Sequence, residues 1–247
     1  MDSEIGVLVC GAKGKVGQVV VAAVEAEPGM RLAGAVDLDD DLQAALQAGP
    51  SVMVDFTAPA AAQGNALAAI AAGVAPVVGT TGMSAAQVDE IDARATTAGV
   101  GGAVIPNFAI GAVLMMRLAE IAAPYFDAVE VIEAHHATKL DAPSGTALAT
   151  ARRLSAARSQ PFGYSQPEKV TLANTRGGEE GSVAVHSLRL PGLVADQEIV
   201  FGATGQTLTI AHRTTSREAF MPGVLATIRA VVAERRFYRS LDAVLGL

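Results

Sequence analysis

The sequence predicts an α/β fold in two domains: a parallel sheet with helices on both faces, and a second α+β domain built on a mixed, mainly antiparallel sheet. In the first half of the chain, short β-branched runs alternate with Ala-rich helical patterns, which is typical of a helix-covered parallel sheet. In the second half, strand-like runs follow one another across glycine turns, which indicates antiparallel pairing. With 247 residues, 51% of them apolar, the chain can bury two cores.

The first half contains the elements of the parallel sheet in strict alternation. Its expected strands are residues 5–10, 32–37, 52–56, 75–78 and 102–105. Its expected helices are residues 16–27, 60–72 and 85–97, the last of them capped by Ser84. Because consecutive parallel strands need a crossover, each helix is expected to lie across one face of the sheet.

The second half changes this rhythm. We expect a helix at residues 110–125, a strand at 128–135 and a helix that begins just after Pro143-Ser144-Gly145. Strand-like runs follow at residues 170–172, 183–190, 197–201 and 207–212, and the tail is expected to be helical at 221–234. The change in strand order places a domain boundary near Asn107.

Charge and composition exclude several classes of partner. Lys+Arg 18 against Asp+Glu 25 gives a net charge of −7, so the average surface repels nucleic acid. An anionic ligand must therefore bind to a local group of positive charges or backbone N–H groups. Cys10 is the single cysteine, which excludes an internal disulfide and a multi-thiolate metal site.

Two segments bear on the location of the protein. The start, residues 1–6, carries Asp2 and Glu4 and lacks a basic region, which argues against a secretory signal. Residues 56–88 lack charged side chains, but polar residues, glycines and two prolines interrupt them, which argues against a membrane span. We expect a cytoplasmic protein with no membrane partner.

A glycine-rich loop follows the first strand and opens the first helix. Gly11, Gly14 and Gly17 are spaced as Gly-x-x-Gly-x-x-Gly, in the position where glycines let a pyrophosphate approach helix N–H groups. Asp37 lies about twenty residues further on, where an acid accepts hydrogen bonds from the adenosine ribose. Glycines here could also serve close packing alone, and Asp37 could belong to a solvated acidic run, but together they favour a dinucleotide site.

The same loop leaves the choice of dinucleotide open. Asp37 favours NAD, whereas Lys13 and Lys15 could compensate the 2′-phosphate of NADP. Two later loops, Asp55-Phe56-Thr57 and Gly79-Thr80-Thr81-Gly82, leave strands at the same expected sheet edge. They are either ordinary βα turns or part of the cofactor crevice, and their position in the fold favours the crevice.

Residues 133–147, EAHHATKLDAPSGTA, hold the densest chemistry in the chain. His135 and His136 would diverge if the strand continues, and no Cys cluster or His-Glu helix motif accompanies them, so a metal site is disfavoured. Ser144 lacks the Gly-x-Ser-x-Gly surroundings of a nucleophile elbow, so hydrolase chemistry is disfavoured too. The sequence predicts no metal.

An anion site fits these residues better. Ser144, Gly145 and Thr146 at a helix start offer N–H groups and hydroxyls, and Lys139 adds a full positive charge, a set that suits a carboxylate. His135 or His136 can supply a proton near neutral pH. A nicotinamide site, an acid and a carboxylate clamp together imply a reductase.

At these residues the chain resembles the dihydrodipicolinate reductase family, nearly from end to end. The most specific match is Glu-x-His-His-x-x-Lys-x-Asp-Ala-Pro-Ser-Gly-Thr-Ala over residues 133–147. The other matching segments are residues 11–17, 55–57, 79–82, 106–108 and 185–187 with Arg189. Ala58 and Ile105 depart from the family pattern beside the cofactor segments, which leaves the cofactor preference open.

The resemblance implies a Rossmann-like dinucleotide-binding domain, residues 1–106 plus 217–247, and a substrate-binding and oligomerisation domain, residues 107–216, in a homotetramer. It implies that NADH or NADPH is bound by Gly11, Lys13, Gly14, Lys15, Val16, Gly17, Asp37, Phe56, Thr57, Gly79, Thr81, Pro106, Asn107 and Phe108. His136, Ser144, Gly145 and Thr146 would hold a small cyclic dicarboxylate, and Lys139 would bind or polarise it.

The implied reaction is NAD(P)H-dependent reduction of (hydroxy)tetrahydrodipicolinate to tetrahydrodipicolinate, in lysine biosynthesis via diaminopimelate, with His135 as general acid. Two rival functions stay open. One is a reductase of a different imine or carbonyl acid, and the other is a non-catalytic dinucleotide-sensing module. No basic nucleic-acid-binding segment accompanies the loop, which disfavours the second rival.

Overall fold

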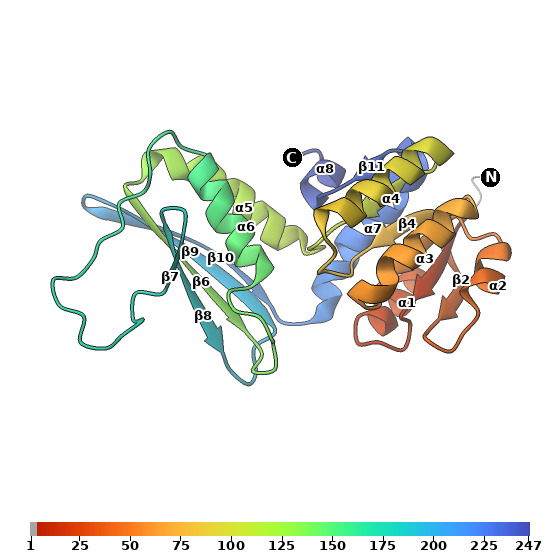
Figure 1. The fold of residues 1–247 in the computed structure, drawn as a ribbon, viewed down its shortest axis with the longest axis horizontal. Helices are drawn as coiled ribbons and strands as arrows, with labels where there is room; N and C mark the ends of the chain where they lie inside the picture. Colours follow the sequence, from red (N-terminus) through yellow and green to blue (C-terminus); the bar gives the residue numbers. More distant parts are fainter. Residues whose placement is uncertain (1–3) are drawn as a thin grey trace. The chain divides into compact units, whose positions relative to one another are not determined.

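The computed structural model describes residues 4–247, so the part of the expected non-secretory start that falls on residues 1–3 lies outside the described residues. The described chain divides into two units. The first runs to Ile110 and continues with Arg217–Leu247, and the second is Gly111–Ser216. Figure 1 shows a separate sheet in each unit.

A six-stranded parallel sheet forms the centre of the first unit, as the sequence predicts. Its strands are β1 (Ile5–Cys10), β2 (Met30–Val36), β3 (Val52–Asp55), β4 (Ala75–Val78), β5 (Gly102–Val104) and β11 (Phe237–Tyr238). Their order is β11-β5-β4-β3-β1-β2, and every neighbouring pair is parallel. Every residue of β3 and β4 is buried, because helices cover both faces of a parallel sheet.

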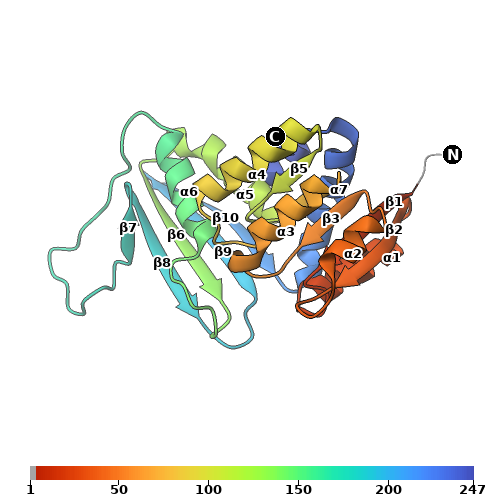
Figure 2. The same ribbon diagram turned by 45° about the vertical axis from the view of Figure 1, so that its right-hand side comes forward.

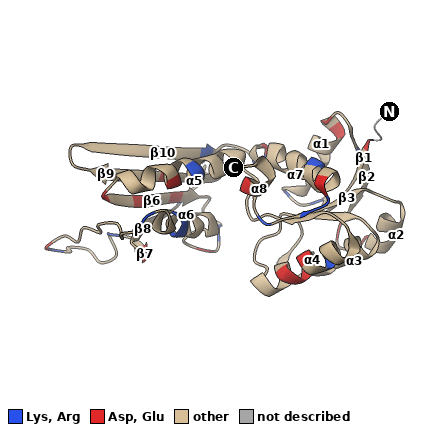
Figure 3. Ribbon diagram, turned by 90° about the horizontal axis from the view of Figure 1, so that it is seen from above, with Lys and Arg blue, Asp and Glu red and all other residues tan. Residues whose placement is uncertain are grey.

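Helices cover both faces of this sheet. They are α1 (Gly17–Ala26), α2 (Leu42–Gln47), α3 (Pro59–Ala71), α4 (Ala85–Ala98), α7 (Met221–Glu234) and α8 (Leu241–Leu245), with a 3-10 turn at Arg217–Phe220. Figure 3 shows α3 and α4 on one side of the sheet and α1 and α7 on the other. Ser84 caps α4 in a capping box with Gln87. The core is made of small and aliphatic side chains such as Ala66, Val78 and Ile91.

The strand order sets where this unit can hold a ligand. The chain runs from β1 outward to β2 and then crosses back to β3 on the other side of β1. The carboxyl ends of β1 and β3 therefore feed loops that leave in opposite directions, and a crevice opens between those loops. The glycine loop follows β1 at this point.

The second unit is built on a mixed, mainly antiparallel sheet, again as predicted. Its strands are β6 (Ala128–His135), β7 (Gly178–Glu180), β8 (Val183–Arg189), β9 (Ala195–Ala203) and β10 (Gln206–Thr214). Their order is β10-β9-β6-β8-β7. Only the β6–β8 pair is parallel among the described strands of this sheet. The helices are α5 (Ile110–Ala122) and α6 (Gly145–Ala156).

Strand β6 presents unlike faces, as its sequence alternation predicts. Val129, Val131 and Glu133 are buried while the residues between them are partly exposed. Helix α6 packs on β6 and β8 (Figures 1 and 2). A carboxylate thus occupies a position where the alternation calls for an apolar side chain.

One expected strand is wrong, and one expected helix ends earlier than predicted. The strand expected at residues 170–172 lies in the loop between α6 and β7, where Val170 is 55% and Leu172 69% exposed. An isolated apolar run gains little without a partner strand to pair with. The helix expected at 110–125 ends at Ala122 and continues as a 3-10 turn, Ala123–Tyr125, because Pro124 lacks the N–H that the α-helix needs.

No helix among residues 4–247 combines the length and the apolar character that a membrane crossing requires. Figure 3 shows acidic and basic positions interspersed along the ribbon of both units. The net negative charge is therefore spread out, and local groups decide where an anion can bind.

Candidate functional site

The glycine loop of the first unit is shaped by steric limits at two of its glycines. Gly11 has φ +77°, in the left-handed region, and the N–H of Gly14 donates to its carbonyl at 3.0 Å. A Cβ on Gly17 would lie 2.0 Å from that same carbonyl oxygen. The start of α1 can therefore fold against the end of β1 only if both residues lack a side chain. The loop brings the N-terminus of a ten-residue helix to the carboxyl edge of the sheet.

A pocket of about 570 Å³ opens beside this loop, at the carboxyl ends of β1, β2 and β3. It is lined by Cys10, Gly11, Lys13, Gly14, Val36, Asp37, Leu38, Asp40, Leu42, Phe56, Thr57, Ala58, Ala61 and Asn65. The sequence pointed to six of these residues as cofactor contacts: Gly11, Lys13, Gly14, Asp37, Phe56 and Thr57. Lys15, Val16 and Gly17 are outside this lining in the described chain.

Asp37 stands directly after β2 and faces the glycine loop. Its carboxylate accepts the N–H of Lys13 at 2.9 Å and the N–H of Leu38 at 2.9 Å. These backbone hydrogen bonds, the Leu38 bond foremost, hold the pKa of Asp37 below its ordinary value. An ionised acceptor fixed at this edge suits the hydroxyls of a ribose.

Cys10 ends β1 beneath the loop; it is buried and is one of the residues that line the pocket. Burial, followed by the nearby charges of Asp55 and Asp37, raises the pKa of Cys10 to about 12. The side chain is therefore a thiol at neutral pH, which makes it a small packing group and not a nucleophile.

Asp55, at the end of β3, organises the neighbouring loops. The carboxylate is fully buried and accepts four hydrogen bonds, from Thr57 N (3.0 Å), Thr57 Oγ1 (2.8 Å), Asn65 Nδ2 (2.8 Å) and Thr80 Oγ1 (2.9 Å). It thereby ties the loop after β3 to α3 and to the loop after β4. Nothing in its sequence segment alone indicates this role beyond the placement of an acid at the end of a buried strand.

Two of the residues expected to border the nicotinamide, Gly79 and Phe108, lie against Phe56. A Cβ on Gly79 would lie 2.2 Å from the Phe56 ring, and the Phe56 and Phe108 ring centroids are 5.8 Å apart. Asn107 accepts the N–H of Ala109 at 2.9 Å. Thr81 and Pro106 line a second pocket of about 260 Å³.

Ala58 and Ile105, the two residues that depart from the family pattern, lie in different surroundings. Ala58 lines the larger pocket and caps α3 without a side-chain hydrogen bond. Ile105 is buried, with 1% of its surface exposed, so it packs in the core of the unit behind the loop.

In the second unit, His135 ends β6 and turns its Nδ1 toward the sheet. That atom lies 2.5 Å from Oε2 of the fully buried Glu133. His136 follows the strand and turns elsewhere, with its Nδ1 2.9 Å from Thr138 Oγ1. The two histidines thus have separate partners, as their positions at a strand end predict.

Arg189 joins this end of β6 to the next strand and to the following loop. Its Nη2 donates to Glu133 Oε1 at 2.8 Å and its Nη1 donates to Glu133 Oε2 at 2.9 Å. The Nη2 group also donates to the carbonyl of Asp141 at 2.7 Å. The resemblance includes Arg189 and Glu133 but implies no role for either, and their pairing is visible only in the fold.

The residues of the expected anion site lie at the start of α6. Ser144 is buried and caps the helix, its Oγ accepting the N–H of Ala147 at 3.2 Å. The backbone N–H of Ser144 itself donates to Glu133 Oε1 at 3.2 Å. A Cβ placed on Gly145 would meet nothing within 4 Å, so there is open space in front of the first turn. Thr146 is the next residue of that turn.

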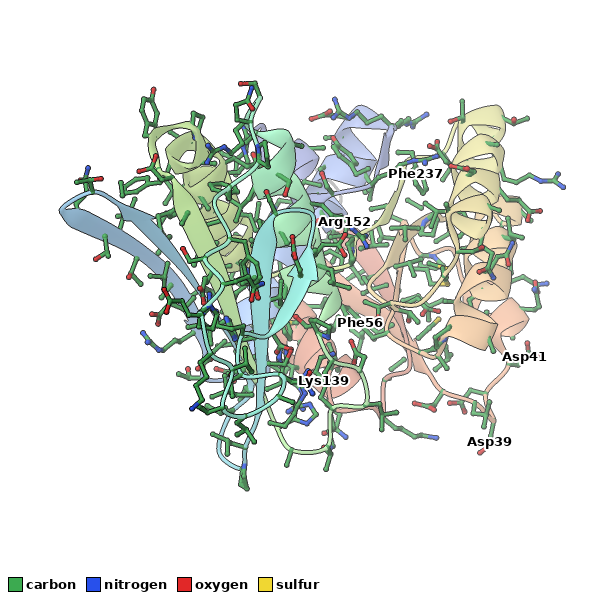
Figure 4. The ribbon with its side chains drawn as sticks, turned by 60° about the vertical axis from the view of Figure 1, so that its left-hand side comes forward. Asp39, Asp41, Phe56, Lys139, Arg152 and Phe237 are labelled. Carbon is green, nitrogen blue, oxygen red and sulfur yellow. The ribbon has the colours of Figure 1, made fainter. Side chains whose placement is uncertain are left out.

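Lys139 lies in the loop between β6 and α6, labelled in Figure 4. Its Nζ donates to Asp141 at 2.6 Å, and its N–H donates to the carbonyl of His136 at 3.1 Å. The Lys139 side chain is 21% exposed. Along the chain, Lys139 therefore lies between His135 at the end of β6 and the start of α6.

Burial and charge act in opposite directions on the two central groups. For His135, burial lowers the pKa, the Glu133 carboxylate raises it, and the charges of Lys139 and Arg189 lower it further, so that the result lies below the ordinary value. For Glu133, burial raises the pKa, but hydrogen bonds from Arg189, Ser187 and His135 hold it below its ordinary value. Glu133 is thus ionised and acts only as an acceptor.

No group of three or more His, Cys, Asp or Glu side chains within residues 4–247 is arranged to hold a metal ion. A histidine bound to a buried carboxylate, a lysine and a helix N-terminus occur in the second unit, and a glycine loop that opens a helix occurs in the first. A parallel-sheet unit of this kind with a second unit so equipped defines the class of two-domain, nicotinamide-dinucleotide-dependent oxidoreductases.

Comparison with known families names the particular group. Residues 5–108 match the family model described as "Dihydrodipicolinate reductase, N-terminus", and residues 111–245 match "Dihydrodipicolinate reductase, C-terminus". The chain therefore belongs to the dihydrodipicolinate reductase family.

Individual relatives match over nearly their whole length. A 4-hydroxy-tetrahydrodipicolinate reductase of Nocardia farcinica is 45% identical over 250 residues, covering 100% of both chains. One of Moorella thermoacetica is 44% identical over 252 residues, covering 94% of each. A solved structure, the dipicolinate-bound dihydrodipicolinate reductase of Paenisporosarcina sp. TG-14, has a TM-score of 0.87 and 36% identity, covering 97% of this chain and 99% of that one.

Proposed function

We propose that this protein is an NAD(P)H-dependent 4-hydroxy-tetrahydrodipicolinate reductase, which acts in lysine biosynthesis via diaminopimelate. The observation that carries the proposal is the full-length similarity to reductases of that name, at 44–45% identity. The proton donor, lysine and helix start of the second unit supply the groups that reduction of an unsaturated dicarboxylate needs.

The residues of the first unit fit a nicotinamide dinucleotide. Any side chain on Gly17 would collide with the Gly11 carbonyl, so the loop keeps the close backbone approach that a pyrophosphate requires. We propose that the loop residues Gly11, Lys13, Gly14, Lys15, Val16 and Gly17 hold the pyrophosphate, while Asp37 holds the adenosine ribose. Phe56, Thr57, Gly79, Thr81, Pro106, Asn107 and Phe108 would border the nicotinamide.

The choice between NADH and NADPH rests on two opposed features of the same loop. Asp37 is held ionised and faces the loop, so it would repel a 2′-phosphate. Lys13 lies 3.8 Å from Asp40 and is largely exposed, free to turn toward a phosphate. We propose that both cofactors are accepted and that NADH binds more tightly.

We propose that the substrate is held in the second unit as a cyclic dicarboxylate. One carboxylate would bind to the N-terminus of α6, at Ser144, Gly145 and Thr146, where the helix dipole favours an anion. His136 and Lys139 would neutralise the remaining charge. The solved dipicolinate-bound relative from Paenisporosarcina supports this class of ligand.

His135 is proposed as the general acid. A bound reduced nicotinamide would supply the hydride, and Nε2 of His135 would deliver a proton to the enamine of the substrate ring. Its Nδ1 is engaged with Glu133, which leaves Nε2 as the nitrogen that can exchange a proton with substrate. Lys139 would hold the substrate or polarise it.

The decisive experiment is a coupled assay. A preceding synthase supplies 4-hydroxy-tetrahydrodipicolinate, and the loss of NADH or NADPH absorbance is followed. Rapid, protein-dependent loss is expected. Tight cofactor binding without turnover would indicate a dinucleotide-sensing module, and turnover only with a different imine or carbonyl acid would indicate the other rival.

We also propose a homotetramer built through the second unit, and a cytoplasmic location, where reduced dinucleotide is available. Light scattering after size exclusion tests the first. A mass of about four chains of 25.1 kDa is expected, and a monomer mass at micromolar concentration would refute it.

A further inference from the structure

Glu133 is a buried, charged residue that has no role of its own in the function proposed above. Its carboxylate is fully buried within β6, in a position that the alternation of the strand reserves for apolar side chains. Burying an ionised carboxylate is costly unless it is paired and hydrogen-bonded. Its partners therefore show what the position does.

Both oxygens of the Glu133 carboxylate have hydrogen-bond partners. Arg189 grips both oxygens, at 2.8 and 2.9 Å, the N–H of Ser144 reaches Oε1 at 3.2 Å, and His135 Nδ1 lies 2.5 Å from Oε2. The side chain of Ser187 forms a further hydrogen bond. Arg189 compensates the charge, so Glu133 can stay ionised while buried.

An ionised carboxylate has no proton to donate. Nδ1 of His135 must therefore carry the hydrogen of this short contact in both the neutral and the charged imidazole. The remaining nitrogen, Nε2, then alternates between protonated and unprotonated forms. The pair is arranged like the base and orienting carboxylate of a hydrolytic triad, with the proton running in the opposite direction.

We propose that Glu133 is the positioning residue of the reductase: it fixes the tautomer and the ring orientation of His135, so that Nε2 is the nitrogen that carries the catalytic proton. The inference rests on the proposed role of His135. It assigns Arg189 to keeping Glu133 ionised, and it makes Glu133 the link between the proton donor and the start of α6 through the N–H of Ser144.

The charges around His135 define what loss of Glu133 would do. Lys139 and Arg189 are the positive groups that act on the imidazole, and Glu133 is the negative one. Asp141, which is largely exposed, is engaged by Lys139. Without the Glu133 charge, both positive groups and burial oppose protonation, and His135 loses the proton that it must deliver.

Glu133→Gln is the variant that tests this. The amide keeps the shape and one oxygen, so the Ser144 contact and substrate binding can persist. We expect kcat to fall about 10²-fold, the scale of a lost proton donor, with KM changed less than about threefold. A purely structural role would raise KM as well, because the start of α6 would move.

A double-variant cycle separates positioning from independent effects. If Glu133 acts through His135, Glu133→Gln combined with His135→Gln turns over no more slowly than His135→Gln alone. If the fold-losses of turnover in the two single variants multiplied in the double variant, the inference would be overturned. Wild-type turnover of His135→Gln would instead overturn the proposed general acid, so the two failures are distinguishable.

Glu130→Gln is the matched control. Glu130 lies on the same strand and also pairs with an arginine and a histidine, Arg176 and His186 (2.8 Å from His186 Nε2), but on the opposite face. We expect its kcat to stay within about twofold of wild type. A loss equal to that of Glu133→Gln would show that any such pair in the sheet matters, and would refute the specific role.

Nitrogen-15 NMR of the histidine rings in the wild-type protein gives a readout independent of activity. Neutral His135 is expected as the Nδ1–H tautomer, and Glu133→Gln is expected to lower its pKa by roughly one to three pH units. An Nε2–H tautomer in the wild type would overturn the inference. Should Glu133→Gln fail to fold, Glu133→Gln with Arg189→Gln removes both charges together. This double variant is expected to lower the pKa of His135 as well, but by less than Glu133→Gln, because the opposing charge of Arg189 is also lost.

Discussion

At the scale of single residues, His135 and Lys139 carry the proposed chemistry. We expect His135→Gln and Lys139→Ala each to lower turnover by about 10²- to 10⁴-fold with the fold intact, because a positioned proton donor and a substrate-binding charge are removed. Turnover in the coupled assay, with circular dichroism to check folding, measures this. Near-normal rates in both variants would contradict the assigned roles.

The pH dependence follows from the direction of the His135 shift. Its pKa lies below 6.5 in the free protein, mainly through burial, and the acid form is lost as pH rises through that value. We therefore expect kcat/KM to fall as the pH rises, with the midpoint of the fall below about pH 6.5. Because a bound dicarboxylate favours the charged imidazole, the corresponding limb of kcat should lie at higher pH. If kcat and kcat/KM fell at the same pH, or if kcat fell at the lower pH, this account would be contradicted.

Asp37 sets the cofactor preference at this same scale. We expect Asp37→Ala to weaken NADH binding by about tenfold and NADPH binding less, because only NADH offers both ribose hydroxyls to the carboxylate. Calorimetric titration with each cofactor measures this. Asp39→Ala, in the same acidic run (labelled in Figure 4), serves as control. Equal losses for both cofactors in Asp37→Ala would argue against the ribose contact.

At the scale of elements, the turn between β1 and α1 depends on one absent side chain. We expect Gly17→Ala to destabilise the protein by about 1–3 kcal/mol and to weaken NADH binding at least about tenfold, since its Cβ would lie 2.0 Å from the Gly11 carbonyl. Gly64→Ala, in the exposed interior of α3 with nothing within 4 Å, is the control. It should stabilise by about 0.5–1 kcal/mol. Chemical denaturation compares them, and equal effects would contradict the steric argument.

The sequence predicted the elements that have strong local signals. The 2-residue and 3.6-residue periodicities located the strands and helices of both sheets, and Ser84 and Ser144 marked helix starts as capping residues. Short elements were missed because their stability comes from distant partners. Strand β11 has two residues and exists by pairing with β5, more than a hundred positions earlier in the chain. Helix α2 has six residues and depends on the Asp41 cap.

The sequence could suggest the members of the candidate site that share one segment, but not the roles that depend on partners far along the chain. His135, Lys139 and Ser144 lie together in one segment, and their residue types indicate their chemistry. The role of Glu133 depends on Arg189, 56 positions later, and that of Asp55 on Thr80, 25 positions later. Spacing within a segment carries no information about such pairs, which only the register of the sheets creates.

At the scale of the whole molecule, an acidic chain is proposed to bind two anions. The net charge of −7 gives no general attraction, so each anion depends on a local arrangement. In the first unit this is the glycine loop with the start of α1, and in the second unit it is the start of α6 with Lys139. Both use a helix N-terminus, which attracts anions whatever the sign of the net charge.

The most direct test of this account is a crystal structure of the protein with NADH and dipicolinate. We predict the NADH pyrophosphate against the residue 11–17 loop, and a dipicolinate carboxylate against Ser144, Gly145 and Thr146 with His135 Nε2 directed at the ring. Dipicolinate bound away from the start of α6, or His135 turned from it while Glu133 stays paired with Arg189, would contradict the account.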